Sequence, residues 1–165
     1  MDIYITEGVG SGRTEKSAFD AALFDAGVAN YNILELSSVI PDGSRIIVEK
    51  INRNAVSEHG HKLYAVLAHQ TAGVRGEGAY AGIGWVKDER TDGGLFVEHH
   101  GKTEDEVGNL IRFSLEDMVQ YRKTHKFGPI GSKIAGTKCD GDYACALVCA
   151  YYESQDWDTK VKEKR

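Results

Sequence analysis

The sequence contains little cysteine or proline and no long hydrophobic run. Its 165 residues include three cysteines and two prolines. The cysteine spacing matches no common zinc motif, and Cys145 and Cys149 lie in an apolar run, so we expect buried free thiols. No run approaches the length of a transmembrane helix. Residues 1–7 lack the basic and apolar regions of a signal peptide, so we expect a cytoplasmic protein with no membrane partner.

Positive charge is also scarce in this chain. Twenty Lys and Arg residues against 25 Asp and Glu residues give a net charge of −5. Nucleic-acid binding needs a basic stripe, and the sequence has none, so we expect no nucleic-acid partner. The negative balance suits a small cationic substrate, although bulk charge does not select one. The length and the ordinary apolar content, 41%, predict one domain with a real core.

Helical periodicity predicts two helices. The first begins after Thr14, which can cap it, and runs to about Ala26, where Gly27 stops it. The second begins at Thr103, which forms a capping box with Glu106. Two helices among many strands favour an α+β fold.

Alternating apolar residues predict the strands. The segment Gly8–Arg13, between the first strand and the first helix, is expected to be a glycine-rich loop. Strands are expected at Asp2–Thr6, Tyr31–Leu36, Arg45–Glu49, Lys62–Thr71, Ala79–Lys87, Gly94–His99, Ile130–Lys138 and Tyr143–Glu153.

A serine pair, Ser37-Ser38, ends an apolar run shortly before Pro41. If the Ser38 hydroxyl faces the carbonyl of Ser37, an N-to-O acyl shift gives an ester. Elimination then opens the ester and leaves dehydroalanine, and loss of ammonia gives a pyruvoyl group. Most serine pairs are loop residues or caps, so the pair alone leaves both interpretations open.

The sequence around this pair resembles the pyruvoyl-dependent arginine decarboxylases. The resemblance is carried in order and spacing by Gly8–Gly12, Ser17–Leu23, Ala26–Ile33 and Leu36–Pro41. It continues more loosely through Gly82–Gly84, Leu95–Glu98 and Cys145–Ala150.

The resemblance implies a fold, a cofactor and a reaction. The implied fold is a four-layer αββα sandwich with mainly antiparallel sheets, formed by residues 1–165 as a single domain. The chain is expected to cleave itself into residues 1–37 and 38–165, which makes a covalent pyruvoyl group from Ser38 without pyridoxal phosphate or a metal. This ketone would form a Schiff base with L-arginine, and the products would be agmatine and carbon dioxide. The implied assembly is a homotrimer of cleaved protomers with active sites between neighbours, or a dimer of such trimers.

Asn32 is the first of three further candidate residues. It lies six residues before Ser38, so strand alternation predicts that both side chains share a face. The tetrahedral oxyanion of the acyl shift needs a hydrogen-bond donor. The resemblance assigns Asn32 to processing and to the active site. Without it, the simpler expectation is a side chain bonded to a turn.

Glu98 is the second candidate. Alternation places it on the face of Phe96 and His100, with Val97 and His99 opposite. A carboxyl group on such a partly apolar face loses hydration, which favours its neutral form. The resemblance makes Glu98 the acid that returns a proton to the α-carbon after carbon dioxide leaves. A strand-end glutamate in solvent is the alternative.

Asp20 is the third candidate, at the edge of the apolar stripe of the first helix. The resemblance assigns this aspartate to the substrate guanidinium, which a carboxylate can bind through two hydrogen bonds. The alternative is a solvated helix face, which we expect for Asp25. Many family members have glycine at the position of Ala29, where alanine would be strained if the backbone needs positive φ.

Two other functions stay open at this stage. One is the same chemistry on another amino acid, such as histidine. The other is an unprocessed homologue that binds a partner or a metabolite. The pairs His59-x-His61 and His99-His100 also suggest a metal, but adjacent strand residues face opposite ways and no acidic or cysteine partner completes either set, so we expect none.

Overall fold

The computed structural model describes residues 1–51 and 57–157. Residues 156–165 are mostly charged, and the sequence predicts a frayed tail there; most of this segment lies outside the described residues. In chain order the elements are β1 (Asp2–Gly12), α1 (Glu15–Ala26), β2 (Asn32–Glu35), β3 (Val39–Ile40), β4 (Arg45–Val48), β5 (Lys62–Ala72), β6 (Gly78–Lys87), β7 (Gly94–Gly101), α2 (Glu104–Gln120), β8 (Gly131–Lys138) and β9 (Tyr143–Gln155).

The strands form two sheets, which confirms the α+β fold class. One sheet has the order β3-β7-β6-β8 and is antiparallel throughout. The other has the order β2-β5-β9-β1-β4 and is mixed. Its three inner strands are antiparallel, but the short edge strands β2 and β4 run parallel to β5 and β1. The expectation of mainly antiparallel sheets therefore holds for the first sheet and needs this correction for the second.

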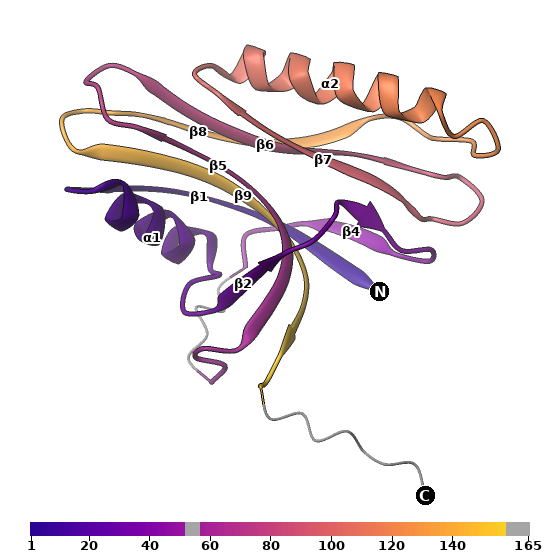
Figure 1. The fold of residues 1–165 in the computed structure, drawn as a ribbon, viewed down its shortest axis with the longest axis horizontal. Helices are drawn as coiled ribbons and strands as arrows, with labels where there is room; N and C mark the ends of the chain where they lie inside the picture. The colour runs from indigo at the N-terminus through magenta and orange to yellow at the C-terminus, as the bar shows by residue number, and fades with distance from the viewer. Residues whose placement is uncertain (52–56, 158–165) are drawn as a thin grey trace, which may run out of the picture.

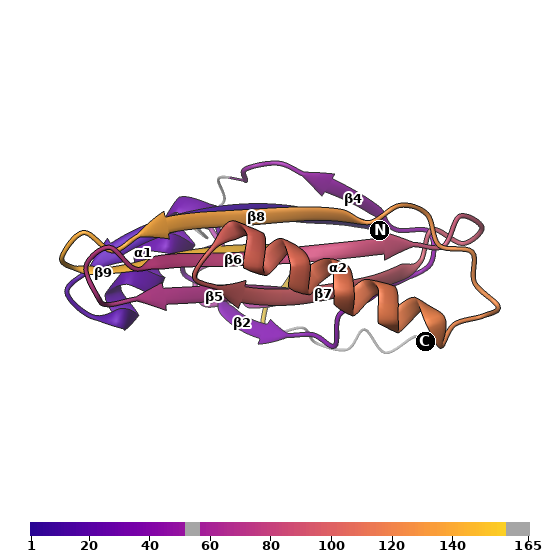
Figure 2. The same cartoon turned by 90° about the horizontal axis from the view of Figure 1, so that it is seen from above.

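Buried side chains fill three successive interfaces. One cluster lies between the two sheets and includes Ile5, Val66 and Phe96. A second lies between α1 and the mixed sheet, and a third between α2 and the antiparallel sheet. Figure 1 shows α2 above β6 and β7 and α1 below β1 and β9, and Figure 2 shows α2 lying along the antiparallel sheet. The inner strands β5, β6 and β9 thus have two buried faces over much of their length, which explains their nearly continuous apolar sequences.

The expected loop over Gly8–Arg13 is instead the second half of β1. Gly8, Gly10 and Gly12 point at α1, and a Cβ atom on any of them would meet that helix at under 3 Å. On Gly10 it would lie 2.7 Å from the Ala18 carbonyl oxygen. The helix presents small side chains here, and Ala18 and Ala22 are fully buried. The glycines therefore serve a close contact between helix and strand rather than a turn.

Both helices begin where the sequence predicts. Thr14 caps α1, and Gly27 ends it with a φ of 77°, a conformation that favours glycine. Thr103 caps α2 by accepting a hydrogen bond from the Glu106 backbone. The Glu106 side chain does not complete the expected capping box, because it accepts from the backbone nitrogen of Lys102 at 2.8 Å. Within the described residues, neither helix is long and apolar enough to span a membrane.

We expect Gly10→Ala to destabilise the fold by about 2 kcal/mol or more, because the added methyl group would overlap the backbone of α1. Gly108 provides a matched control on α2, since the nearest atom to an added Cβ is Ile134 Cδ1 at 3.7 Å. Gly108→Ala should stabilise by up to about 1 kcal/mol, the usual helical preference for alanine. Urea unfolding of both variants measures this, and equal effects would contradict the close contact.

Candidate active site

The chain crosses from one sheet to the other at the serine pair. Before the pair, the Leu36 backbone nitrogen donates to the Ala65 carbonyl of β5 at 2.9 Å. After it, the Ser38 carbonyl accepts from the Phe96 nitrogen of β7 at 2.8 Å. The peptide bond between Ser37 and Ser38 is therefore held between anchors on two different sheets.

Ser38 has an unusual backbone conformation. Its φ is 49°, in the left-handed region. The other described non-glycine residues with positive φ are Asn30 and Asp92, whose side chains tolerate it better. A serine held there costs roughly 1–3 kcal/mol, which the surrounding contacts must supply. The strain falls on the residue at which the family resemblance predicts cleavage.

The Ser38 hydroxyl contacts Glu98. Its Oγ lies 2.7 Å and 2.9 Å from the two carboxylate oxygens, so it donates to that group. Glu98 shares the face of Phe96 in β7, as alternation predicts, while His99 faces α2 and lies 2.8 Å from Ser114 Oγ. The expectation of a dehydrated Glu98 was wrong for the single chain, because Glu98 lies at the end of the apolar face and is exposed.

Tyr152, which the sequence reasoning missed, also contacts this segment. Its hydroxyl donates to the Val39 carbonyl at 2.9 Å, and its ring stands edge-on to Phe96 with centroids 6.2 Å apart. Burial and the nearby Glu98 charge raise the pKa of Tyr152 above its usual range. Alternation along β9 places Tyr152 on the inter-sheet face with Ala150, and that pattern could have found it.

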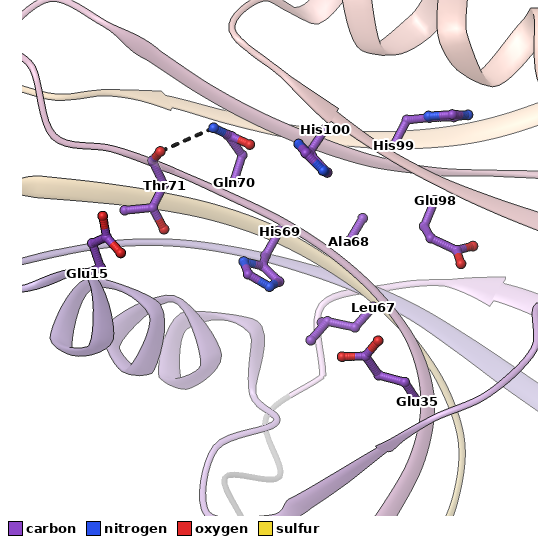
Figure 3. Close-up of a pocket in the computed structure, with 10 residues that line it drawn as sticks. All are labelled: Glu15, Glu35, Leu67, Ala68, His69, Gln70, Thr71, Glu98, His99 and His100. Carbon is purple, nitrogen blue, oxygen red and sulfur yellow. Dashed lines mark hydrogen bonds between the residues drawn. The ribbon is translucent and has the colours of Figure 1, made fainter.

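A cavity of about 390 Å³ lies beside Glu98. It forms where the edge strands end, because β2 covers only residues 62–65 of β5 and β3 covers only residues 94–95 of β7. Figure 3 shows Glu98 and His100 from β7 lying opposite His69 from β5 and Glu35 from β2. Burial lowers the pKa of His69, against the opposing charge of Glu35. Carboxylates and a histidine that favours its neutral form make this cavity suitable for a cation.

The structure does not bring Asn32 to the serine pair. Its side-chain nitrogen donates to the Gly60 carbonyl at 2.6 Å, and that oxygen also accepts from Trp157 Nε1 at 2.8 Å. The expectation of a shared face with Ser38 was wrong, because β2 ends at Glu35 and the alternation ends with it. Asn32 here has the simpler turn-binding arrangement.

Asp20 lies on the outer side of α1 and is exposed. Within the described residues its side chain makes no hydrogen bond or ion pair, so no contact in this part of the chain connects it to Ser38. Asp25 was expected to be solvated, and this was wrong. It accepts from the Val9 backbone at 2.9 Å and from Lys50 at 2.6 Å. The Val9 nitrogen is available because β4 pairs only with residues 2–5 of β1, whereas β9 pairs with the other edge of β1.

Ala29 is not strained in this structure. The positive φ in this turn, 67°, falls on Asn30. The concern about alanine at this position therefore does not apply. The three cysteines are buried and free, which includes the expected Cys145 and Cys149. Among residues 1–51 and 57–157, no group of three or more His, Cys, Asp or Glu side chains is placed to hold a metal ion.

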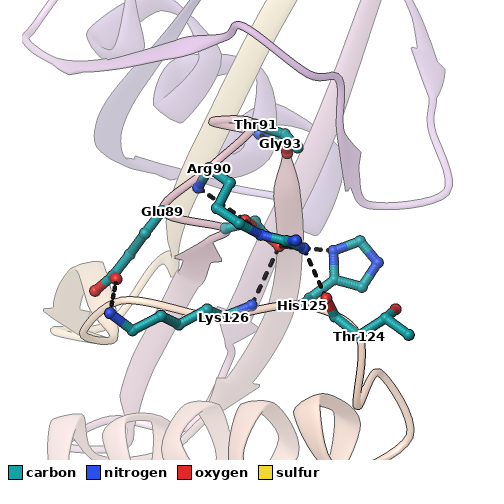
Figure 4. A network of polar contacts seen from close by, with 8 residues as sticks. Glu89, Arg90, Thr91, Gly93, Thr124, His125 and Lys126 are labelled. Atoms are coloured by element: carbon teal, nitrogen blue, oxygen red, sulfur yellow. Dashed lines mark hydrogen bonds and ion pairs between the residues drawn. The ribbon is translucent and has the colours of Figure 1, made fainter.

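A buried carboxylate fixes the loops beside β3. Asp88 is 1% exposed and accepts from the Arg90 backbone nitrogen at 2.8 Å, with His125 Nδ1 also at 2.8 Å (Figure 4). The Arg90 N–H and the other donors hold the pKa of Asp88 well below its usual range, although burial opposes this. The turn after β3 joins this region through a bond from the Gly43 nitrogen to the Thr91 carbonyl at 2.7 Å. The network therefore steadies the segment that follows Ser38.

Comparisons with known proteins identify the family of this chain. The family model for pyruvoyl-dependent arginine decarboxylase (PvlArgDC) matches residues 2–156. The chain belongs to the pyruvoyl-dependent arginine decarboxylase family. This is a family of lyases that depend on a covalent pyruvoyl group.

This chain is similar to the following two relatives and one solved structure. The pyruvoyl-dependent arginine decarboxylase of Picrophilus torridus is 31% identical over 149 residues, covering 82% of this chain and 81% of the relative. That of Halobacterium salinarum strain R1 is 32% identical over 155 residues, covering 93% and 95%. A solved pyruvoyl-dependent histidine decarboxylase at pH 8 is 18% identical, with a TM-score of 0.43, covering 62% of this chain and 57% of that one.

The strain at Ser38 predicts an unusual order of variant stabilities. Ser38→Gly should be about 1 kcal/mol more stable than Ser38→Ala, because glycine accepts positive φ without a steric cost and neither variant has the hydroxyl. Denaturant unfolding of the two variants measures the difference.

Ser132, an exposed residue of β8, provides the control. In the Ser38→Ala background, Ser132→Gly should be less stable than Ser132→Ala, as is usual for glycine in a strand. If the glycine variant is less stable than the alanine variant at both positions, Ser38 carries no backbone strain.

Proposed function

We propose that the chain cleaves itself between Ser37 and Ser38 and then converts L-arginine to agmatine and carbon dioxide with a pyruvoyl group made from Ser38. The observation that supports this most is the contact of Ser38 Oγ with both oxygens of Glu98. A serine at positive φ, anchored on both sides and facing a carboxylate, has its hydroxyl poised as a nucleophile.

The cleavage requires only groups of this chain and water. Ser38 Oγ bonds to the Ser37 carbonyl carbon, and the C–N bond between the residues breaks. Glu98 takes the hydroxyl proton, and the Ser38 nitrogen receives a proton as it becomes an amine. Loss of the Ser38 Cα proton then breaks the Cβ–Oγ bond, which gives Ser37 a carboxylate and leaves an enamine at position 38. Its tautomer reacts with water, releases ammonia and leaves a ketone.

The oxyanion formed on Ser37 needs a donor. The family resemblance gives this role to Asn32. In this chain that role would require the Asn32 amide to leave the Gly60 carbonyl, since the two are 2.6 Å apart. The role of Asn32 in processing is therefore part of the proposal. Within the described residues, no hydrogen bond joins the Asn32 side chain to the serine pair.

The residues around position 38 fit the expected cofactor, because the backbone is anchored on both sides and Glu98 faces the side chain. A pyruvoyl group there would supply an electron sink for the substrate's α-carbon. Once the Ser38 hydroxyl is gone, Glu98 is released from its hydrogen bond. It can then hold a proton and return it to the α-carbon.

The cavity beside Glu98 supports a cationic substrate. Glu35 lies on its wall, and a guanidinium carries the charge and the donors that carboxylates bind. Asp20 would bind the guanidinium through two hydrogen bonds. Because it is exposed and contacts nothing near Ser38, we assign it to the site of a neighbouring protomer in a trimer of cleaved chains.

The decisive test is the intact mass under denaturing conditions. Wild type should give two fragments that separate between residues 37 and 38, and the larger should react with carbonyl reagents. Ser38→Ala should remain full length, because it lacks the hydroxyl that attacks Ser37. A single full-length mass for the wild type would refute the proposal and favour an unprocessed binding homologue.

The substrate is tested separately. Asp20→Asn should cleave like wild type but lose about 10- to 150-fold in kcat/KM for arginine, which corresponds to one charged hydrogen-bonded pair of about 1.5–3 kcal/mol. Asp105→Asn on α2 is the control and should leave kcat/KM unchanged. Unchanged arginine turnover in Asp20→Asn would refute the assignment of Asp20 to the guanidinium. A cleaved wild type that turns over another amino acid, such as histidine, but not arginine would favour that amino acid as the substrate.

A further inference from the structure

Two consecutive carbonyl groups, those of Ser38 and Val39, accept hydrogen bonds from residues of different sheets. The Ser38 carbonyl accepts from the Phe96 nitrogen of β7 at 2.8 Å. The next carbonyl, that of Val39, accepts from the Tyr152 hydroxyl of β9 at 2.9 Å. The backbone that leaves Ser38 is therefore fixed by the antiparallel sheet and by a side chain of the mixed sheet.

Tyr152 is well suited to act as a fixed anchor. Its strand, β9, pairs with both β1 and β5 and lies in the middle of the mixed sheet. The ring contacts Phe96, which is fully buried and whose nitrogen binds Ser38. Burial and the Glu98 charge raise the pKa of Tyr152, so its hydroxyl keeps the proton that it donates. Tyr152 thus donates a hydrogen bond to Val39, packs against Phe96 and lies close enough to Glu98 to feel its charge.

We propose that Tyr152 is a positioning residue for the acyl shift, because its bond to the Val39 carbonyl keeps Ser38 at positive φ with Oγ on Glu98. Serine does not hold that conformation unless its neighbours are fixed. Without the hydroxyl of Tyr152, the segment after Ser38 can relax toward ordinary φ values, and the fraction of chains with Oγ in place falls. The inference rests on the proposed self-cleavage and names a residue that controls its rate.

The test follows the cleavage of freshly synthesised full-length chain by intact mass over time. Tyr152→Phe keeps the ring and removes the hydroxyl, and it should slow cleavage about tenfold, in line with the loss of one hydrogen bond. Tyr64→Phe is the matched control. Tyr64 is also half-buried on the mixed sheet, but its hydroxyl bonds to Gln155 Oε1 at 2.8 Å and not to the Ser38 segment.

Thermal midpoints of both variants separate positioning from stability. We expect similar midpoints and a slow rate in Tyr152→Phe alone. If Tyr64→Phe slows cleavage as much, the effect is one of general stability and the inference is overturned. If wild type and Tyr152→Phe cleave at the same rate, the inference fails while the proposed function stands. A wild type that never cleaves refutes the proposed function and this inference with it.

Neutral hydroxylamine identifies the step, because it cleaves an ester rapidly and an amide slowly. If Tyr152 acts on the acyl shift, Tyr152→Phe accumulates no ester, and hydroxylamine produces no burst of fragments. A burst would mean that the ester forms normally and that elimination is the slowed step. That result would overturn the assignment of Tyr152 to the acyl shift.

Discussion

The chain has to pass between two sheets within a few residues, and the geometry of the candidate site depends on that crossing. Leu36 is bonded to β5 and Ser38 to β7, so the peptide between the serines has fixed ends on both sides. A free loop would let Ser38 adopt an ordinary φ, and a regular strand would turn alternate side chains to opposite faces. The crossing does neither. It holds the Ser38 backbone at positive φ and brings the Ser38 hydroxyl into contact with Glu98.

The same crossing also creates the cavity. Because the edge strands β2 and β3 are short, the edges of β5 and β7 are left without strand partners beyond them. Glu35 and His69 from the mixed sheet and Glu98 and His100 from the antiparallel sheet meet in that open space. Strain at the serine pair and room for a ligand thus arise from one feature, the early end of both edge strands.

Features that depend only on neighbouring residues, such as strand alternation and helix caps, could be predicted from the sequence. The face of Glu98 followed from regular alternation in β7, and the helix starts followed from Thr14 and Thr103. Features set by tertiary contacts could not. Gly10 indicated a loop because glycine signals a turn as readily as a close helix contact.

The site contacts were harder to predict than the elements. The position of Asn32 depended on where β2 ends, which is decided by the crossing rather than by the residues of β2. Tyr152 bonds a carbonyl 113 positions away in the chain, and no local pattern encodes that partner. The strand order likewise depends on long-range pairing, such as that of β1 with β9.

The place of β1 in the mixed sheet gives a cut chain a property that an uncut chain lacks. β1 lies between β9 and β4, and both of these neighbours follow residue 37 in the sequence. A cut after Ser37 would leave the short piece held by strands on both of its sides, with Ile3 and Ile5 in the core. The pieces would separate only by unfolding. Refolding would then be a bimolecular reaction, so the stability of the cut protein would rise with its concentration.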